Sequence, residues 1–119
     1  MREAIWYFDF ISPYAYLALR EIERLPGAEI RYRPILLAAL LNHWGHKGPA
    51  EIPAKRAWTY RWCTWYAEQR GIPFRFPSAH PFNSLPYLRL AIAADCRADS
   101  KPVRRPARFA STIPVPSRM

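Results

Sequence analysis

The sequence is short of cysteine and of long apolar runs, and each shortage excludes a class of protein. Its 119 residues include two cysteines, Cys63 and Cys96, which lie too far apart for a CxxC redox motif and are too few for a disulfide framework. No apolar stretch approaches the roughly 20 residues that cross a bilayer, and the N-terminus lacks the basic and then apolar pattern of a secretory signal. We therefore expect a cytoplasmic protein that contacts no membrane.

Histidine is also scarce, and the three histidines do not predict a metal site. His43 and His46 are close in sequence, but no cysteine or carboxylate lies near enough to complete a set of ligands. Cys63 lies among aromatic residues in a helical stretch, which favours a packed thiol over a reactive one. Neither a metal ion nor a reactive cysteine is expected.

Basic charge is present in excess, and more than half of it lies at the C-terminal end. The formal net charge is +9, of which residues 1–95 carry +4 and residues 96–119 carry +5. The end of the chain is also rich in proline and arginine, so residues 95–119 are predicted to be a disordered basic tail. A nucleic-acid-binding module using this tail and exposed aromatic side chains is the alternative, and it predicts binding that weakens steeply with salt. We expect no nucleic-acid partner.

The first part of the chain, residues 4–34, has the pattern of a strand, a helix and a second strand. Residues 4–11 are almost continuously apolar, as in a central strand that is covered on both faces, and Asp9 is the polar interruption. Apolar residues then recur at helical spacing across residues 15–25, before a Pro-Gly pair that stops the helix. Residues 29–33 alternate with a period of two. Such a βαβ unit binds ligands at the carboxyl ends of its strands.

Ser12 follows the first strand at that carboxyl end, and Pro13 comes directly after it. This pair predicts a helix that begins with serine at the N-cap and proline at the first helical position. A hydroxyl at a helix N-terminus favours a negatively charged partner such as a thiolate or a carboxylate. From position alone, a serine that only caps the helix is the alternative.

The rest of the apolar sequence is predicted to be helical. Helices are expected over residues 35–41, 55–70 and 85–94, with Asn83 and Ser84 capping the last of them. The middle helix carries an aromatic stripe that we expect to be core rather than a base-stacking platform. The stripe consists of Trp58, Trp62, Trp65 and Tyr66.

Three motifs in this order resemble the 2-hydroxychromene-2-carboxylate isomerases and kappa-class glutathione transferases, a thioredoxin-like group related to DsbA. The motifs are FDFISPYAYL at residues 8–17, RPI with NHWG and GPAEIPAKR across residues 33–56, and GIPF with PFNSL and Arg89 across residues 71–89. The resemblance implies an α/β, thioredoxin-like (DsbA-like) fold with a helical insertion. In this sequence the βαβ unit would take residues 4–34 and the insertion residues 35–94.

The resemblance also implies glutathione as cofactor and assigns site residues. Ser12 would be catalytic and would hold the glutathione thiolate through its hydroxyl, because the thiolate rather than the thiol is the nucleophile. Lys55 matches a lysine of the glutathione-binding loop and suits a carboxylate of the tripeptide, with a solvated lysine as the alternative. Asn83 and Arg89 are weaker candidates for ligand contacts, since asparagine also caps helices and arginine is common on surfaces. His46 stands where many relatives have asparagine.

The implied reaction interconverts 2-hydroxychromene-2-carboxylate and trans-o-hydroxybenzylidenepyruvate in aromatic catabolism. The partners would be glutathione and a small aromatic carboxylate, with a homodimer as the assembly that relatives tend to form. A kappa-like transferase is one alternative. A DsbA-like oxidoreductase would need cysteines at positions 12 and 15, where this chain has Ser12 and Ala15.

The likeness ends near Asp95. Family members continue with more helix, a Val-Pro segment facing the active serine and a strand hairpin, and none of this is recognisable in residues 95–119. We therefore expect residues 1–94 to be the N-terminal part of a DsbA-like domain that is truncated or frame-shifted afterwards. Such a chain would have an unpaired sheet edge and marginal stability, and an inactive fragment is a further alternative.

Overall fold

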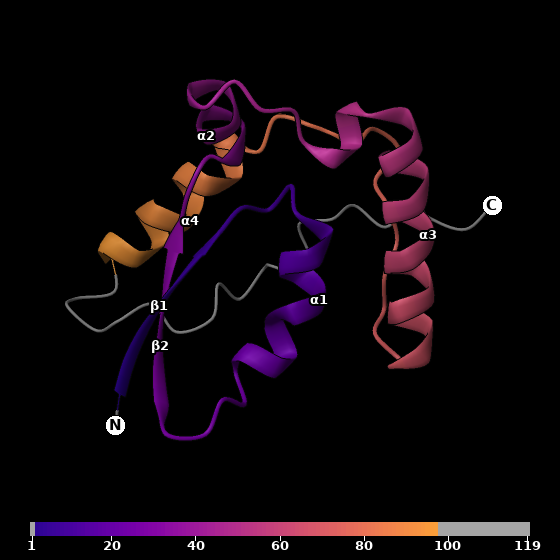
Figure 1. Cartoon of the computed structure of the whole chain (residues 1–119). Helices are drawn as coiled ribbons and strands as arrows, with labels where there is room; N and C mark the ends of the chain where they lie inside the picture. The colour runs from indigo at the N-terminus through magenta and orange to yellow at the C-terminus, as the bar shows by residue number, and fades with distance from the viewer. Residues whose placement is uncertain (1, 98–119) are drawn as a thin grey trace.

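The computed structural model describes residues 2–97, in which a small parallel sheet is surrounded by helices (Figure 1). The predicted basic tail lies almost entirely outside the described residues. The elements, in chain order, are β1 (Arg2–Phe8), α1 (Pro13–Ile22), β2 (Ala28–Pro34), α2 (Leu37–His43), the 3₁₀ turn η1 (Pro49–Glu51), α3 (Pro53–Gln69) and α4 (Leu85–Arg97).

The βαβ unit predicted from the sequence is confirmed. Within the described residues the sheet has two strands, β1 and β2, which run parallel with Ala4 opposite Ile30 and Phe8 opposite Pro34. The expectation that the first strand is covered on both faces is wrong, because every β1 side chain except Trp6 and Phe8 is exposed. The strand ends at Phe8 rather than at residue 11 as predicted, since the chain turns immediately after Phe8.

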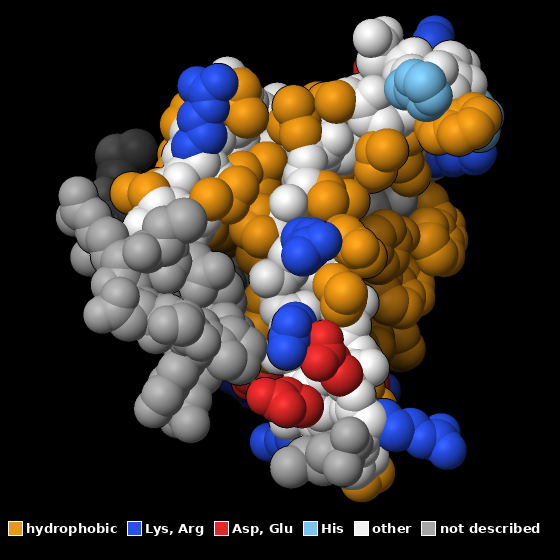
Figure 2. All heavy atoms as spheres, turned by 90° about the vertical axis from the view of Figure 1, so that its left-hand side faces the viewer, with side chains coloured by type: hydrophobic (Ala, Val, Ile, Leu, Met, Phe, Trp, Pro, Cys, Tyr) orange, Lys and Arg blue, Asp and Glu red, His pale blue; other side chains and the backbone are white. Residues whose placement is uncertain are grey.

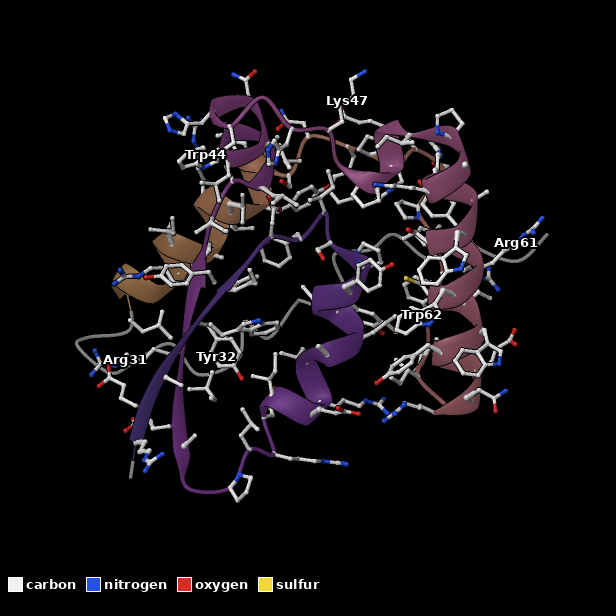
Figure 3. The ribbon with its side chains drawn as sticks, in the orientation of Figure 1. Arg31, Tyr32, Trp44, Lys47, Arg61 and Trp62 are labelled. Carbon is white, nitrogen blue, oxygen red and sulfur yellow. The ribbon has the colours of Figure 1, made fainter. Side chains whose placement is uncertain are left out.

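Helix α1 joins two groups of buried side chains. Leu19 belongs to a group with Phe8, Tyr32 and Leu88, which come from β1, β2 and α4, whereas Leu17 lies in a second group with Cys63. Figure 3 shows Tyr32 extending from β2 toward α1. The helix ends earlier than the apolar spacing predicted, at Ile22.

Helix α3 packs beside α1 and confirms the predicted helix over residues 55–70 almost to the residue. It ends at Gln69, and Gly71 follows the C-cap residue with a φ of 61°, the left-handed conformation that glycine tolerates best. The expectation that its aromatic stripe is core is wrong for half of the stripe, since Trp58 and Trp65 are 60% and 55% exposed. Trp62 stacks on Trp58 with centroids 6.2 Å apart, and it points from α3 toward α1 (Figure 3).

Helix α4 packs against β2 through Leu88, which is 3% exposed, and its predicted start at Leu85 is confirmed. Apolar side chains are exposed on α4 as well, since Leu90 and Ile92 are half exposed or more. Figure 2 shows hydrophobic side chains spread over the face of the molecule on which α4 lies. Of the described helices, none combines the length and the apolar character needed to cross a membrane.

Candidate functional site

Ser12 begins α1 at the carboxyl end of β1, and its predicted capping role is confirmed. Its φ and ψ of −84° and 112° are extended, and Pro13 is the first helical residue. The Ser12 Oγ accepts a hydrogen bond of 3.1 Å from the backbone N–H of Ala15. A hydroxyl can accept and donate at once. Among residues 2–97 the Ser12 hydroxyl has no acceptor for its own hydrogen, and its side chain is half-buried, so it can donate to a ligand.

Asp9, the polar interruption in the first apolar run, fixes the turn that leads to Ser12. Its side chain is buried at 3% exposure, and its two carboxylate oxygens have different partners. Oδ1 accepts from the N–H of Ile11 at 3.2 Å, and Oδ2 accepts from the N–H of Leu37 at 2.8 Å. Leu37 is the first residue of α2, and this helix has no side-chain cap of its own from Leu36. Asp9 therefore shapes the serine turn and caps α2 from a distance.

A second set of contacts near Ser12 comes from residues that the sequence reasoning did not assign to the site. His80 Nε2 lies 2.8 Å from the carbonyl oxygen of Ile11, and His80 Nδ1 lies 2.6 Å from the hydroxyl of Tyr60. The loop that carries His80 thus reaches both α3 and the serine turn. The polar interruption at Asp9 was a usable sequence signal, whereas nothing in the sequence links residues 11, 60 and 80.

The other predicted site residues lie on α3 and in or just before α4. The first turn of α3, which contains Lys55, and the start of α4 lie at the same end of the molecule as the β1–α1 connection (Figure 1). Lys55 is exposed, and so is Arg89 further along α4. The side-chain oxygen of Asn83 accepts from the N–H of Leu85 at 3.1 Å, which gives it the expected role at a helix start. Its amide hydrogens remain available as donors.

The single described thiol is separate from this site. Cys63 is completely buried between α1 and α3, as the sequence predicted, and burial raises the pKa of its thiol to about 11. At neutral pH it is therefore a neutral, packed side chain. Tyr14 connects the start of α1 to the same helix, since its hydroxyl donates to Thr59 Oγ1 at 3.4 Å.

The arrangement can stabilise a negative charge but supplies no nucleophile of its own. The N-terminus of α1 carries a partial positive charge, and the Ser12 hydroxyl offers a hydrogen-bond donor at the same point. An unactivated serine hydroxyl is a weak nucleophile, and within the described residues no base contacts Ser12 Oγ. The site therefore suits an anion, such as a thiolate, brought by a ligand.

Comparisons with known proteins agree with this geometry. Residues 4–107 match the family model described as the DSBA-like thioredoxin domain. The 2-hydroxychromene-2-carboxylate isomerase of Pseudomonas putida is 37% identical over 82 residues, covering 61% of this chain and 38% of that protein. Glutathione S-transferase kappa 1 of Caenorhabditis elegans is 41% identical over 54 residues, covering 42% of this chain and 24% of the relative.

A solved structure points the same way. A 2-hydroxychromene-2-carboxylate isomerase structure superposes with a TM-score of 0.58 and 30% identity, over 66% of this chain and 41% of that one. The fold class and the resemblance predicted from the sequence are thereby confirmed. The chain spans well under half the length of these relatives.

Proposed function

The chain belongs to the DSBA-like thioredoxin domain family, and on this premise we propose that it carries the thiolate-binding part of a glutathione-dependent isomerase site. The observation that carries the proposal is the Ser12 hydroxyl at the N-cap of α1, with a hydrogen free to donate. Where oxidoreductases of this fold carry a redox-active cysteine pair, the chain has Ser12 and Ala15. These two positions therefore cannot carry out dithiol-disulfide chemistry. The isomerases and kappa-class transferases among its relatives support glutathione as the thiol.

The residues present fit a bound glutathione. Ser12 would donate its hydroxyl hydrogen to the sulfur, and the α1 dipole would favour the ionised form. Lys55, exposed on the first turn of α3, would pair with a carboxylate of the tripeptide. The amide hydrogens of Asn83, just before α4, and the guanidinium of Arg89, further along α4, are weaker candidates for contacts with the tripeptide. Bound glutathione would supply a thiolate nucleophile for reversible addition to a conjugated double bond.

The proposed reaction is the interconversion of 2-hydroxychromene-2-carboxylate and trans-o-hydroxybenzylidenepyruvate. In this reaction the chain would hold the thiolate ready and orient the tripeptide, and both tasks need fixed donors rather than a protein nucleophile. Transfer of glutathione to an electrophile is the second candidate, which the similarity to the kappa-class enzyme favours. Both reactions need the same Ser12 donor, so one experiment on Ser12 tests their shared step.

Two substitutions separate thiolate binding from capping. Aspartate and threonine both cap helices, so Ser12→Asp and Ser12→Thr should keep the free energy of unfolding within about 0.5 kcal/mol of the wild type. Threonine keeps a hydroxyl donor, whereas an aspartate carboxylate is an acceptor only and repels a thiolate. We expect the threonine variant to bind glutathione and the aspartate variant to lose binding, as measured by amide shifts in a glutathione titration.

The outcome decides between the proposal and the capping alternative. Equal glutathione responses in the aspartate and threonine variants would assign Ser12 to capping alone. Substrate turnover, followed by the change in ultraviolet absorbance of 2-hydroxychromene-2-carboxylate with and without glutathione, then distinguishes isomerisation from transfer. An electrophilic aromatic chloride serves as the transferase substrate in the parallel assay.

A further inference from the structure

The imidazole of His80 connects the serine turn to α3, across 69 residues of sequence. Nε2 contacts the carbonyl oxygen of Ile11 at 2.8 Å, and Nδ1 contacts the Tyr60 hydroxyl at 2.6 Å. The rings of Phe76 and Phe82 flank the imidazole with centroid distances of 5.7 and 6.2 Å. Both ring nitrogens are therefore engaged, and aromatic contacts fix the plane of the ring.

These contacts determine the tautomer of the neutral imidazole. A backbone carbonyl oxygen can only accept, so the nitrogen facing Ile11, Nε2, must carry the hydrogen. Nδ1 then has a lone pair and accepts from the Tyr60 hydroxyl. Burial raises the pKa of Tyr60, which keeps its phenol protonated and able to donate. The Tyr60 hydroxyl also lies 3.1 Å from the His80 carbonyl oxygen, but the contact with Nδ1 is the shorter of the two.

The carbonyl that His80 holds belongs to the peptide group joining Ile11 to Ser12. In a planar trans peptide the carbonyl and the N–H point in opposite directions. His80 holds the carbonyl side, and the N–H of Ser12 donates to the backbone oxygen of Asp9 at 3.2 Å. With both edges engaged, the peptide plane cannot rotate, and this fixes the direction in which the Ser12 side chain leaves the backbone.

We propose that His80 is a positioning residue for Ser12, and that Tyr60, by donating to Nδ1, holds the imidazole in the orientation in which His80 does this. The inference rests on the proposed function in that Ser12 holds the thiolate. His80 acts through the peptide group that it contacts, since both of its ring nitrogens already have partners in the protein. Glutathione binding should then depend on a donor at the Nε2 position rather than on the histidine ring as such.

The first test uses the unmodified full chain. Nitrogen-15 spectra of the His80 ring at neutral pH should show a protonated Nε2 and an unprotonated Nδ1. In Tyr60→Phe, which keeps the aromatic ring and removes the hydroxyl, Nε2 should stay protonated, while the Nδ1 signal should shift to that of a nitrogen that has lost its hydrogen bond. A wild-type ring protonated on Nδ1 instead would overturn the proposal without any variant having to fold.

The second test compares two substitutions at position 80. Glutamine places an amide donor near the position of Nε2, whereas leucine removes every donor. We expect His80→Leu to weaken glutathione binding about tenfold, the effect of one lost hydrogen bond in the site, and His80→Gln to restore it to within about twofold of the wild type. His43→Leu, at an exposed position on α2, is the matched control and should leave binding unchanged.

Amide shifts measured without glutathione separate this proposal from the proposed function. The Ser12 and Ala15 amides should move in His80→Leu and return in His80→Gln, because they report the serine turn directly. If these amide shifts change in this way while the wild type shows no response to glutathione, His80 positions Ser12 and the proposed function fails. If the wild type binds glutathione through Ser12 but both position-80 variants bind equally well, or both equally poorly, the positioning role is refuted and the proposed function stands.

Discussion

Replacing the buried carboxylate of Asp9 should weaken both the stability of the fold and the site. The side chain is 3% exposed and accepts from two backbone N–H groups, those of Ile11 and Leu37. Asp9→Ala leaves both donors without their partner inside the protein. Hydrogen bonds to a charged group contribute about 1.5–3 kcal/mol each, and partial access of water to the vacated space recovers some of the loss. We expect the free energy of unfolding to fall by about 3 kcal/mol.

Asp9→Asn gives the graded comparison for this prediction. Its one carbonyl oxygen can serve one of the two N–H groups, while its amide hydrogens face the other, so we expect a loss of about 1.5 kcal/mol. Glu68→Ala removes the same charge from an exposed position on α3 and should change stability by less than about 0.5 kcal/mol. Urea unfolding followed by circular dichroism measures all three variants and the wild type.

Hydrogen exchange shows whether the loss arises at the two predicted amides. The amides of Ile11 and Leu37 should exchange faster in Asp9→Ala by more than the global change in stability requires, whereas the amide of Ala67 inside α3 should follow the global change. An Asp9→Ala protein as stable as Glu68→Ala, with both amides still protected, would refute the role assigned to Asp9. Equal losses in the alanine and asparagine variants would show that the carboxylate does not serve two donors.

Further predictions concern the buried side chains. The folded-state pKa of Cys63 is about 11, above its usual 9.0. The contribution of the buried thiol to the free energy of unfolding is therefore complete below pH 9 and is lost as the pH rises toward 11. In that range the free energy of unfolding should fall by up to about 1.4 kcal/mol per pH unit. Urea unfolding in this range should show the decline, and Cys63→Ala should flatten it. In a Cys96→Ser background the thiol should stay unreactive toward a disulfide reagent at pH 8 until the protein unfolds. Leu88→Ala should cost about 3 kcal/mol, while Leu90→Ala, at a 61% exposed position on the same helix, should cost less than about 0.5 kcal/mol.

Sequence patterns predicted the elements of this fold because those patterns are local. The switch from an apolar run to helical spacing at Ser12 and Pro13 is contained in a few residues, and it located the start of α1 correctly. The end of β1 was missed because Asp9 turns the chain by bonding Ile11 and Leu37, and the second of these lies 28 residues away. A contact between residues so far apart produces no periodic pattern in the sequence from which it could be predicted.

Burial was the least predictable property for a related reason. Trp58 and Trp65 have the apolar character of core residues, and in sequence nothing distinguishes them from Trp62, which faces α1. Whether an apolar side chain is covered depends on which elements are available to pack on it. Within residues 2–97 neither Trp58 nor Trp65 is covered, so a pattern typical of core residues predicts more burial than these residues show.

The position of Ser12 depends on contacts between residues close in sequence and on contacts with distant parts of the chain. The cap to Ala15 and the turn bond from Ile11 to Asp9 are local and form whenever α1 forms. The contacts of Asp9 with Leu37 and of Ile11 with His80 need α2 and the 73–84 loop to be packed in place. Loosening either segment would therefore misdirect the Ser12 hydroxyl while α1 remains helical. Glutathione binding should decline before the helical signal does as denaturant is added, because the site needs tertiary contacts that the helix does not.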